Sequence, residues 1–213
     1  MFGGTFHSHR FQKNQGLPEV SFGNPILFMR ILLTLLFCLL LCEARSQAGS
    51  RKFSRAELKT IEGKRYLLEN EKGICVIVFL SPTCPLSQKY TLTLNELAKS
   101  FADTVRFFGV FAEAKPELSE YAAFKTKYHI RFPLLVDSKK TLVRNLSATV
   151  TPEAFVISKG TVIYHGAIDD WAISLGKMRY SASTNFLESA IHAAIADKIP
   201  VTSYQNPVGC YID

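Results

Sequence analysis

The stretch whose residue types favour chemistry lies where an apolar run meets a helical pattern. Cys84 follows the run 76–80 and directly precedes Pro85, which suits the first helical position because its missing N–H would have no partner there. A thiol at a helix N-terminus faces unpaired backbone N–H groups and the positive end of the helix dipole, and both stabilise the thiolate. The sequence therefore predicts a nucleophilic, ionised sulfur within reach of solvent, with a hydroxyl hydrogen bond from Ser81 or Ser87. The alternative is an ordinary buried cysteine near a helix cap.

A reactive thiolate needs a second thiol to release its product. A sulfenic acid formed from a peroxide and a mixed disulfide formed from a disulfide are both resolved by another cysteine. Cys75 lies inside the apolar run 74–80 and is expected to be a buried strand residue. Cys210, in the loop-rich tail, is then the plausible intramolecular partner, and we expect a Cys84–Cys210 pair that cycles between dithiol and disulfide. Alternatively, Cys210 belongs to a static disulfide, anchors the tail or stays unpaired.

Hydrophobic periodicity predicts an α/β frame for these residues. Continuous apolar runs predict strands, and apolar residues spaced three and four apart predict helices. Strands are expected at 65–68 after a turn at 62–64, and at 74–80, 105–112, 132–137, 153–158 and 161–168. Helices are expected from Pro85, from Pro116, over 139–146 and from Asn185, and a loop over 169–183. Asn185 and Glu188 resemble a capping box. The order β-α-β-α-β-α-β-β-α predicts a mixed sheet with helices on both faces and an antiparallel hairpin at its edge.

Four motifs follow one another in an order that resembles a known family. They are Phe79…Cys84-Pro85, Thr151-Pro152…Phe155, Tyr164-His165-Gly166-Ala167-Ile168-Asp169-Asp170 and Gly209-Cys210-Tyr211-Ile212. Over about residues 53–213 the set resembles the peroxiredoxin-like branch of the alkyl hydroperoxide reductase/thiol-specific antioxidant (AhpC/TSA, redoxin) family. The resemblance implies a thioredoxin-like three-layer sandwich with a mixed central sheet. It also implies a cis bond between Thr151 and Pro152, and a substrate-binding edge there that faces Cys84 and pairs with an extended peptide.

Three positions differ from the patterns of related families. Ser87 stands where thioredoxins carry the second cysteine of C-x-x-C, and Ser81 stands where many members of this branch carry a cysteine. Strict peroxiredoxins have a proline seven residues before the reactive cysteine, where this chain has Ile77. The resemblance implies thiol–disulfide exchange or peroxide reduction at Cys84. The implied partners are a protein disulfide or a peroxide and a thiol reductant, with no bound cofactor.

The composition is that of one globular domain. The chain has 213 residues, of which 47% are hydrophobic and 20% are charged, which is enough for one good core. The net charge is +7, but no run of Lys and Arg exceeds two residues. We interpret this as a solvated basic surface with no nucleic-acid site, the alternative being an acidic or membrane-surface partner.

The N-terminal segment is not expected to join that domain. Residues 31–42 are almost wholly apolar but short for a membrane span, and they follow Met29 and a basic residue. Small residues lie at the last and third-last positions before a cut after Ala48, as in secretory signals. We interpret 29–48 as a signal peptide behind an upstream extension at 1–28.

This interpretation predicts an exported domain at 49–213, periplasmic or extracellular. Cys38 and Cys42 would leave with the signal. The alternatives are an uncleaved anchor or a lipid on Cys42, either of which would hold the protein at a membrane.

Two further functions stay open from the sequence. A copper-handling chaperone of thioredoxin-like fold would use the soft ligands Cys84 and Cys210 together with His165. A binding module that kept the fold and lost turnover is the other. Lone histidines are expected to be packed or surface residues, so no metal site is assigned, and Asp169 and Asp170 are interpreted as part of a capped, solvated loop.

Overall fold

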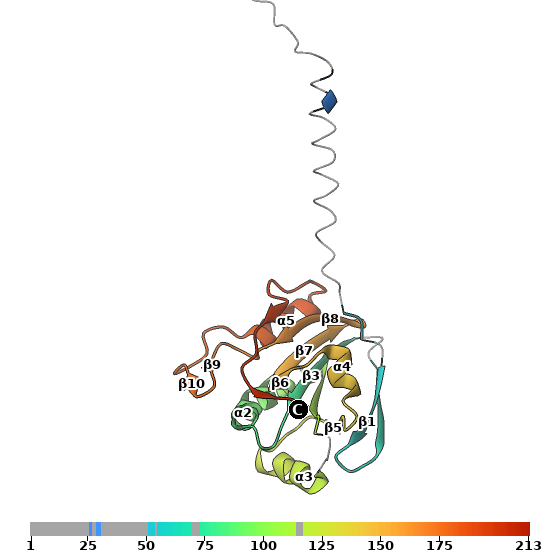
Figure 1. The fold of residues 1–213 in the computed structure, drawn as a ribbon, viewed down its shortest axis with the longest axis vertical. Coiled ribbons are helices and arrows are strands. Elements are labelled where there is room, and N and C mark those ends of the chain that lie inside the picture. The colour runs from blue at the N-terminus through green and yellow to red at the C-terminus, as the bar shows by residue number, and fades with distance from the viewer. Residues whose placement is uncertain (1–25, 27–28, 31–50, 54, 70–72, 114–116) are drawn as a thin grey trace, which may run out of the picture. The chain divides into compact units, whose positions relative to one another are not determined.

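The computed structural model describes residues 26, 29–30, 51–53, 55–69, 73–113 and 117–213. The chain divides into two units, residues 1–48 and 49–213, and the second unit holds the strands and helices labelled in Figure 1. Most of the interpreted signal, including Cys38 and Cys42, and the expected helix start at Pro116 lie outside the described residues. Among the residues described, no helix is long and apolar enough to cross a bilayer.

A mixed sheet of eight strands forms the centre of the second unit. In spatial order its strands are β11 (Tyr204–Gln205), β8 (Thr161–Gly166), β7 (Glu153–Ser158), β3 (Ile74–Leu80), β4 (Val105–Phe111), β5 (Leu134–Val136), β1 (Arg55–Thr60) and β2 (Arg65–Glu69). β3 pairs parallel with β4 and antiparallel with β7, and β4 pairs parallel with β5. Two smaller pairs are β9 (Ala172–Ser174) with β10 (Lys177–Met178), and β6 (Val150–Thr151) with β12 (Cys210–Tyr211).

Helices cover both faces of the sheet, as the strand–helix order predicts. α2 (Pro85–Ser100), α3 (Leu118–Lys127) and α5 (Phe186–Ile195) bury apolar residues in one core, and α4 (Thr141–Leu146) buries its own in the core on the other side. α2 begins at Pro85 and buries Tyr90, Leu94 and Leu97, the predicted stripe. The predicted mixed α/β sandwich is confirmed.

The position of β3 explains why residues 74–80 form an unbroken apolar run. Val76, Val78 and Leu80 belong to the core under α2, α3 and α5, whereas Cys75 and every second residue after it belong to the core under α4. Because both faces are covered, every position must be apolar. Cys75 is fully buried, as predicted, and burial raises the pKa of its thiol to about 12.

Several predicted details differ from the structure. Residues 169–183 are not a plain loop, because they contain the β9–β10 hairpin, which turns at Gly176 with φ 79°. The capping box at Asn185 is not formed: its side-chain amide donates to the Glu188 carboxylate at 3.2 Å, so the two side chains bond each other. The strand expected at 132–137 is shortened to β5. The tail also adds β11 and β12, which at two residues each are too short for periodicity to predict.

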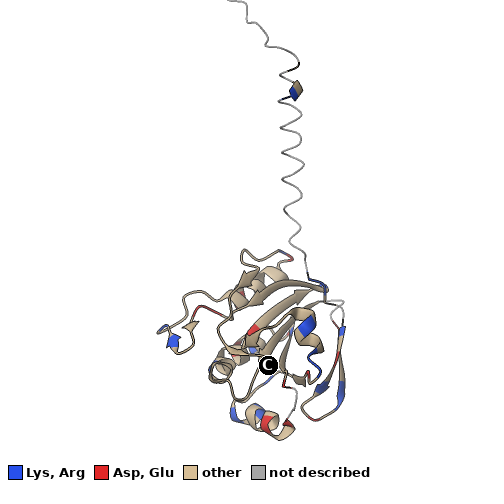
Figure 2. Ribbon diagram, viewed as in Figure 1, with Lys and Arg blue, Asp and Glu red and all other residues tan. Residues whose placement is uncertain are grey.

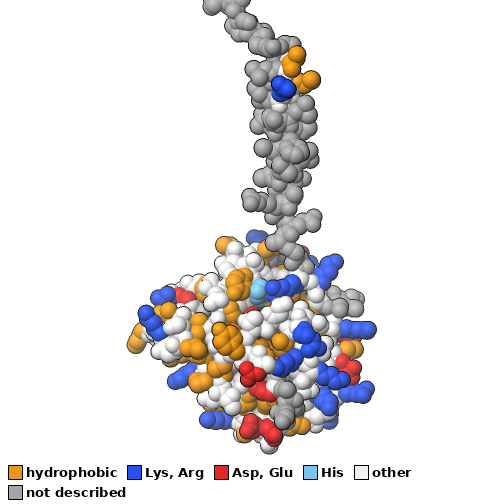
Figure 3. Space-filling view, in the orientation of Figure 1, with side chains coloured by type: hydrophobic (Ala, Val, Ile, Leu, Met, Phe, Trp, Pro, Cys, Tyr) orange, Lys and Arg blue, Asp and Glu red, His pale blue; other side chains and the backbone are white. Residues whose placement is uncertain are grey.

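Charged groups are spread over the surface of this unit. Lys and Arg occur on several elements, among them the β1–β2 hairpin, α4 and β10 (Figure 2). On the face seen in Figure 3, Lys and Arg are most numerous on the right and apolar side chains on the left. The solvated basic surface without a nucleic-acid site stays a prediction.

Candidate functional site

Cys84 lies at the junction of β3 and α2, as predicted. It is the residue before the first helical position, with extended dihedrals (φ −79°, ψ 116°), and its backbone N–H donates to the Ser81 carbonyl at 3.2 Å. The expectation that its sulfur lies within reach of solvent is wrong, because only 1% of the residue is exposed. The reason is that the loop at Thr151 and the C-terminal tail lie against it.

The loop opposite Cys84 is the one that the resemblance indicated. The bond between Thr151 and Pro152 is cis, and the Thr151 carbonyl oxygen lies 3.0 Å from Cys84 Sγ, where it accepts the thiol proton. Thr151 also belongs to β6, which pairs antiparallel with β12, so that Cys210 is opposite Thr151. The tail therefore runs along the very edge that was expected to bind substrate (Figure 1).

Gly209 lets the tail come this close. A Cβ at this position would lie 2.3 Å from the Thr151 carbonyl oxygen and 3.2 Å from the Pro152 nitrogen. Further along, the Ile212 N–H donates to the Thr149 carbonyl at 3.0 Å and the Thr151 hydroxyl donates to the Cys210 carbonyl at 3.4 Å. The Gly-Cys motif thus has two roles. Gly209 allows the tail to lie against the Thr151 backbone, and Cys210 is placed beside Cys84 as a result.

Cys84 and Cys210 are both free thiols, and they lie on either side of Thr151: its carbonyl oxygen accepts the Cys84 thiol, and Cys210 pairs with Thr151 across β6 and β12. Burial raises the pKa of Cys84, but hydrogen bonds to its sulfur from the Cys210 thiol and from the backbone N–H groups of Ser87 and Cys210 outweigh burial, and the pKa falls below its ordinary value. Burial also raises the pKa of Cys210, and its hydrogen bond to Cys84 adds to the effect, giving a pKa of about 11. The pair therefore loses its first proton readily and keeps the second, with Cys84 as the thiolate.

The predicted serines act differently from each other. The Ser87 backbone N–H supplies the helix-terminus donor to Cys84, whereas its hydroxyl accepts the Ser81 N–H at 3.2 Å. The Ser81 hydroxyl lies 3.1 Å from the Thr83 hydroxyl. In this turn it is thus the Ser87 backbone N–H, and not a serine hydroxyl as predicted, that donates to Cys84. Pro85 opens the helix, as predicted.

One residue beside the site was missed from the sequence. Glu153 is only 2% exposed, and its Oε2 accepts the Thr149 N–H at 2.8 Å, the Thr149 hydroxyl at 3.2 Å and the Val150 N–H at 3.4 Å. Its carboxylate thereby holds the short strand that carries Thr151. A lone carboxylate at the start of an otherwise apolar strand was the available signal.

His165 contacts the Glu153 carboxylate and belongs to no group of side chains that could bind a metal among the described residues. Its Nδ1 is 3.8 Å from Glu153 Oε1, is buried and has no hydrogen-bond partner within the described part of the chain. Within the same residues, no group of three or more His, Cys, Asp and Glu side chains is arranged to hold a metal ion. Cys84, Cys210 and His165 therefore do not form the copper site that the sequence left open.

Asp170 accepts the N–H groups of Ser183 and Thr184, so this part of the loop is capped as predicted. The neighbouring Asp169 is buried instead, and it accepts the Tyr90 hydroxyl at 2.5 Å and the Trp171 N–H at 2.9 Å.

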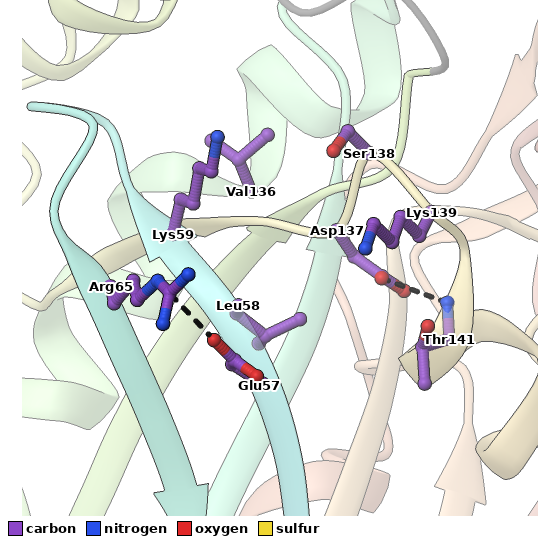
Figure 4. A pocket seen from close by; sticks show the side chains of 9 residues that line it. All are labelled: Glu57, Leu58, Lys59, Arg65, Val136, Asp137, Ser138, Lys139 and Thr141. Atoms are coloured by element: carbon purple, nitrogen blue, oxygen red, sulfur yellow. Dashed lines mark hydrogen bonds and ion pairs between the residues drawn. The ribbon is translucent and has the colours of Figure 1, made fainter.

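Two surface hollows differ in whether a reactive side chain lines them. One, of about 440 Å³, opens beside Cys210, with Ser81, Thr83 and Tyr211 among its lining residues. The other, of about 490 Å³, lies between the β1–β2 hairpin and the start of α4, and Figure 4 shows Asp137 turned to the helix and Arg65 turned to Glu57. Of these two hollows in the described part of the chain, the one beside Cys210 reaches a group able to do redox chemistry.

The mixed sheet, the helix-terminal cysteine and the cis-proline loop define a thioredoxin-like protein. Solved structures of similar fold include a "hypothetical protein" from Sinorhizobium meliloti 1021, with a TM-score of 0.66, 21% identity and coverage of 79% of this chain and 95% of that one. An "uncharacterized conserved protein" from Geobacillus kaustophilus has a TM-score of 0.65 and 20% identity, with coverage of 77% of this chain and 90% of that one.

The chain belongs to the AhpC/TSA family, whose model matches residues 50–165. It is also 27% identical over 108 residues to "Thioredoxin-like protein YneN" of Bacillus subtilis (strain 168), a match that covers 50% of this chain. That match spans 63% of the relative's length. The predicted family, a redoxin of thioredoxin-like fold, is thus confirmed.

Proposed function

We propose that this redoxin is an exported thiol–disulfide oxidoreductase in which Cys84 and Cys210 cycle between a dithiol and a disulfide. The single observation that carries the proposal is that β12 places Cys210 opposite Thr151, whose carbonyl oxygen lies 3.0 Å from Cys84 Sγ. The pKa of Cys84 is lowered and that of Cys210 is raised, which agrees with this pairing. A low pKa makes Cys84 both the thiolate nucleophile and the better leaving group of the pair. Because β12 holds Cys210 beside the strand whose Thr151 carbonyl contacts Cys84, closure of the disulfide is an intramolecular step.

The reaction with a disulfide substrate balances within this pair. With the C-terminal tail displaced from β6, the Cys84 thiolate attacks one sulfur of the substrate, and the other substrate sulfur leaves as a thiolate and takes up a proton. Cys210 then loses its proton and attacks Cys84 Sγ, which expels the second substrate thiol and closes the Cys84–Cys210 disulfide. Two electrons pass from the protein to the substrate.

Thiol–disulfide exchange is favoured over efficient peroxide reduction. Ile77 stands where the resemblance implies a proline in strict peroxiredoxins, and this departure speaks against efficient peroxide reduction. Export rests on the interpreted signal at 29–48, and an oxidising compartment suits a disulfide-forming pair.

The test is a mass map of the non-reduced full chain after equilibration in thiol–disulfide buffers of graded potential. Among the cysteines of residues 49–213 we expect one disulfide, between Cys84 and Cys210, that opens and closes reversibly, with Cys75 free throughout because it is buried in β3. Recovery of Cys84 and Cys210 as free thiols at every potential would overturn the proposal. Release of the mature chain without residues 29–48 from a secreting host tests export separately.

A further inference from the structure

The strand edge expected to bind a peptide is already occupied by the chain itself. β12 pairs with β6 in the register Cys210 to Thr151 and Tyr211 to Val150. The next residue continues the pairing, with the Ile212 N–H on the Thr149 carbonyl at 3.0 Å. An extended segment of another protein would need the same backbone groups, and both cannot pair there at once.

The two sulfurs are unequally accessible. Cys84 is 1% exposed, whereas Cys210 is half-buried and lines the hollow of about 440 Å³ together with Ser81, Thr83 and Tyr211. That volume lies in the range of sites for small molecules. A reagent that enters this hollow reaches Cys210, whereas Cys84 is not among the residues that line it.

We propose that the oxidised pair is reduced by low-molecular-weight thiols, which enter this hollow and attack Sγ of Cys210, and that β12 excludes extended protein segments. This inference rests on the proposed function, since it requires the Cys84–Cys210 disulfide. It assigns a substrate class to the hollow and the role of entry point to Cys210.

The electron flow follows the difference in pKa. The thiolate of the small molecule attacks Cys210 Sγ, the bond to Cys84 breaks, and Cys84 leaves as a thiolate that keeps its charge. A second small thiolate attacks the small-molecule sulfur of the mixed disulfide, so that the small disulfide departs and Cys210 takes up a proton. Two small thiols thus reduce one protein disulfide. Because the sulfur with the lower pKa leaves faster, attack on Cys210 is also the favoured direction.

The first measurement uses the oxidised full chain and 2-mercaptoethanol. A brief reaction is quenched with acid, and the adduct is located by mass spectrometry. We expect the mercaptoethanol adduct on Cys210 and a free thiol on Cys84. An adduct on Cys84 overturns the proposal, whereas a chain that never formed the disulfide overturns the proposed function instead.

The second measurement compares reductants. Rates with 2-mercaptoethanol and with a reduced protein dithiol are each divided by the rate of the same reductant on a free model disulfide. We expect the normalised rate of the protein dithiol to be at least about tenfold lower, because its approach needs the occupied edge. Equal normalised rates contradict the exclusion by β12.

Gly209→Val sharpens this comparison, because its Cβ cannot fit against the Thr151 carbonyl oxygen. We expect it to raise the normalised rate of the protein dithiol at least about tenfold by freeing the edge. The matched control, Val201→Ile, adds bulk to a fully exposed tail residue and should change neither rate. If Gly209→Val leaves the protein-dithiol rate unchanged in a folded chain, β12 is not the barrier; if the variant fails to fold, the adduct map on the natural chain still decides.

Discussion

The N-termini of α2 and α4 each stabilise one acidic side chain, but the two side chains differ in what else contacts them. At α4, the buried carboxylate of Asp137 accepts the Thr141 N–H at 2.8 Å (Figure 4). It also accepts the N–H groups of Leu142 and Val143 at 2.7 and 3.0 Å. At α2, the residue before the helix is Cys84, whose sulfur receives the backbone N–H of Ser87. Both helix starts stabilise negative charge by the same physics.

The difference lies in what else touches the anion. Asp137 follows β5 directly and lies four residues before the first residue of α4, so its three bonds are fixed by local chain geometry. Cys84 depends in addition on Cys210, which comes from the other end of the domain. The carboxylate at α4 is therefore a structural cap. The thiolate at α2 has a pKa that also depends on Cys210, which a disulfide or a substitution can change.

Cys210→Ala should break the comparison most strongly, because it removes both the resolving thiol and a donor to Cys84. Disulfide formation at Cys84 within the chain is abolished. The pKa of Cys84 should rise, since the lost hydrogen bond had stabilised the charged form while the remaining cover still disfavours it. The measurement is the ultraviolet absorbance of the thiolate against pH, in a background in which Cys38, Cys42 and Cys75 are replaced by Ala so that no other thiol contributes.

The natural pair in that background should titrate in two steps, the first below the ordinary value of 9.0 and the second at about 11. Cys210→Ser is the matched control, because its hydroxyl can still donate. A first step that stays in place in Cys210→Ala would mean that the helix terminus alone lowers the pKa.

Asp137→Ala should cost stability without touching the redox site. It leaves three N–H groups at the start of α4 without their acceptor, and we expect a loss of about 2 kcal/mol in the free energy of unfolding. Denaturant unfolding of the reduced chain measures this loss. The titration of Cys84 should be unchanged, and a shift there would show that the two helix starts are coupled across the sheet.

Glu153→Ala tests whether the Glu153 carboxylate holds β6 against Cys84. Without the carboxylate, the N–H groups of Thr149 and Val150 lose their acceptor, and we expect a loss of about 1–2 kcal/mol together with a looser β6. Alkylation of Cys84 should then accelerate while Cys75 stays protected.

Glu153→Gln keeps an acceptor oxygen and should restore slow alkylation of Cys84. Parallel acceleration at Cys75 and Cys84 would indicate global unfolding rather than local loosening at β6.

The sequence predicts the frame well because the frame is built from periodic patterns. The bounds of β3 and the start of α2 agree with the prediction to the residue, since a strand buried on both faces and a Pro at the first helical position leave little ambiguity. Cys75 as a packing residue follows from the same run.

The cover over Cys84 is not predictable from the sequence by these means. It depends on a two-residue strand that pairs with a segment about 60 positions earlier, and local patterns carry no information on such long-range pairing. The role of Glu153 was missed for a related reason: its three hydrogen bonds go to backbone groups and, for the third, to a threonine hydroxyl, whose positions only the fold defines.

Ser87→Ala should have the smallest effect and separates side chain from backbone at the reactive helix start. The hydroxyl of Ser87 accepts the Ser81 N–H, so its loss should cost about 1 kcal/mol or less in stability, the usual range for one neutral hydrogen bond. The backbone N–H that points to Cys84 is unchanged by this substitution, so the first thiol titration should stay where it is. Unfolding and thiolate absorbance measured on the same sample give both values. A clear rise in the first pKa would show that the hydroxyl, like the Asp137 carboxylate at α4, acts directly on the anion, and the contrast between a side-chain cap and a backbone-stabilised thiolate would be lost.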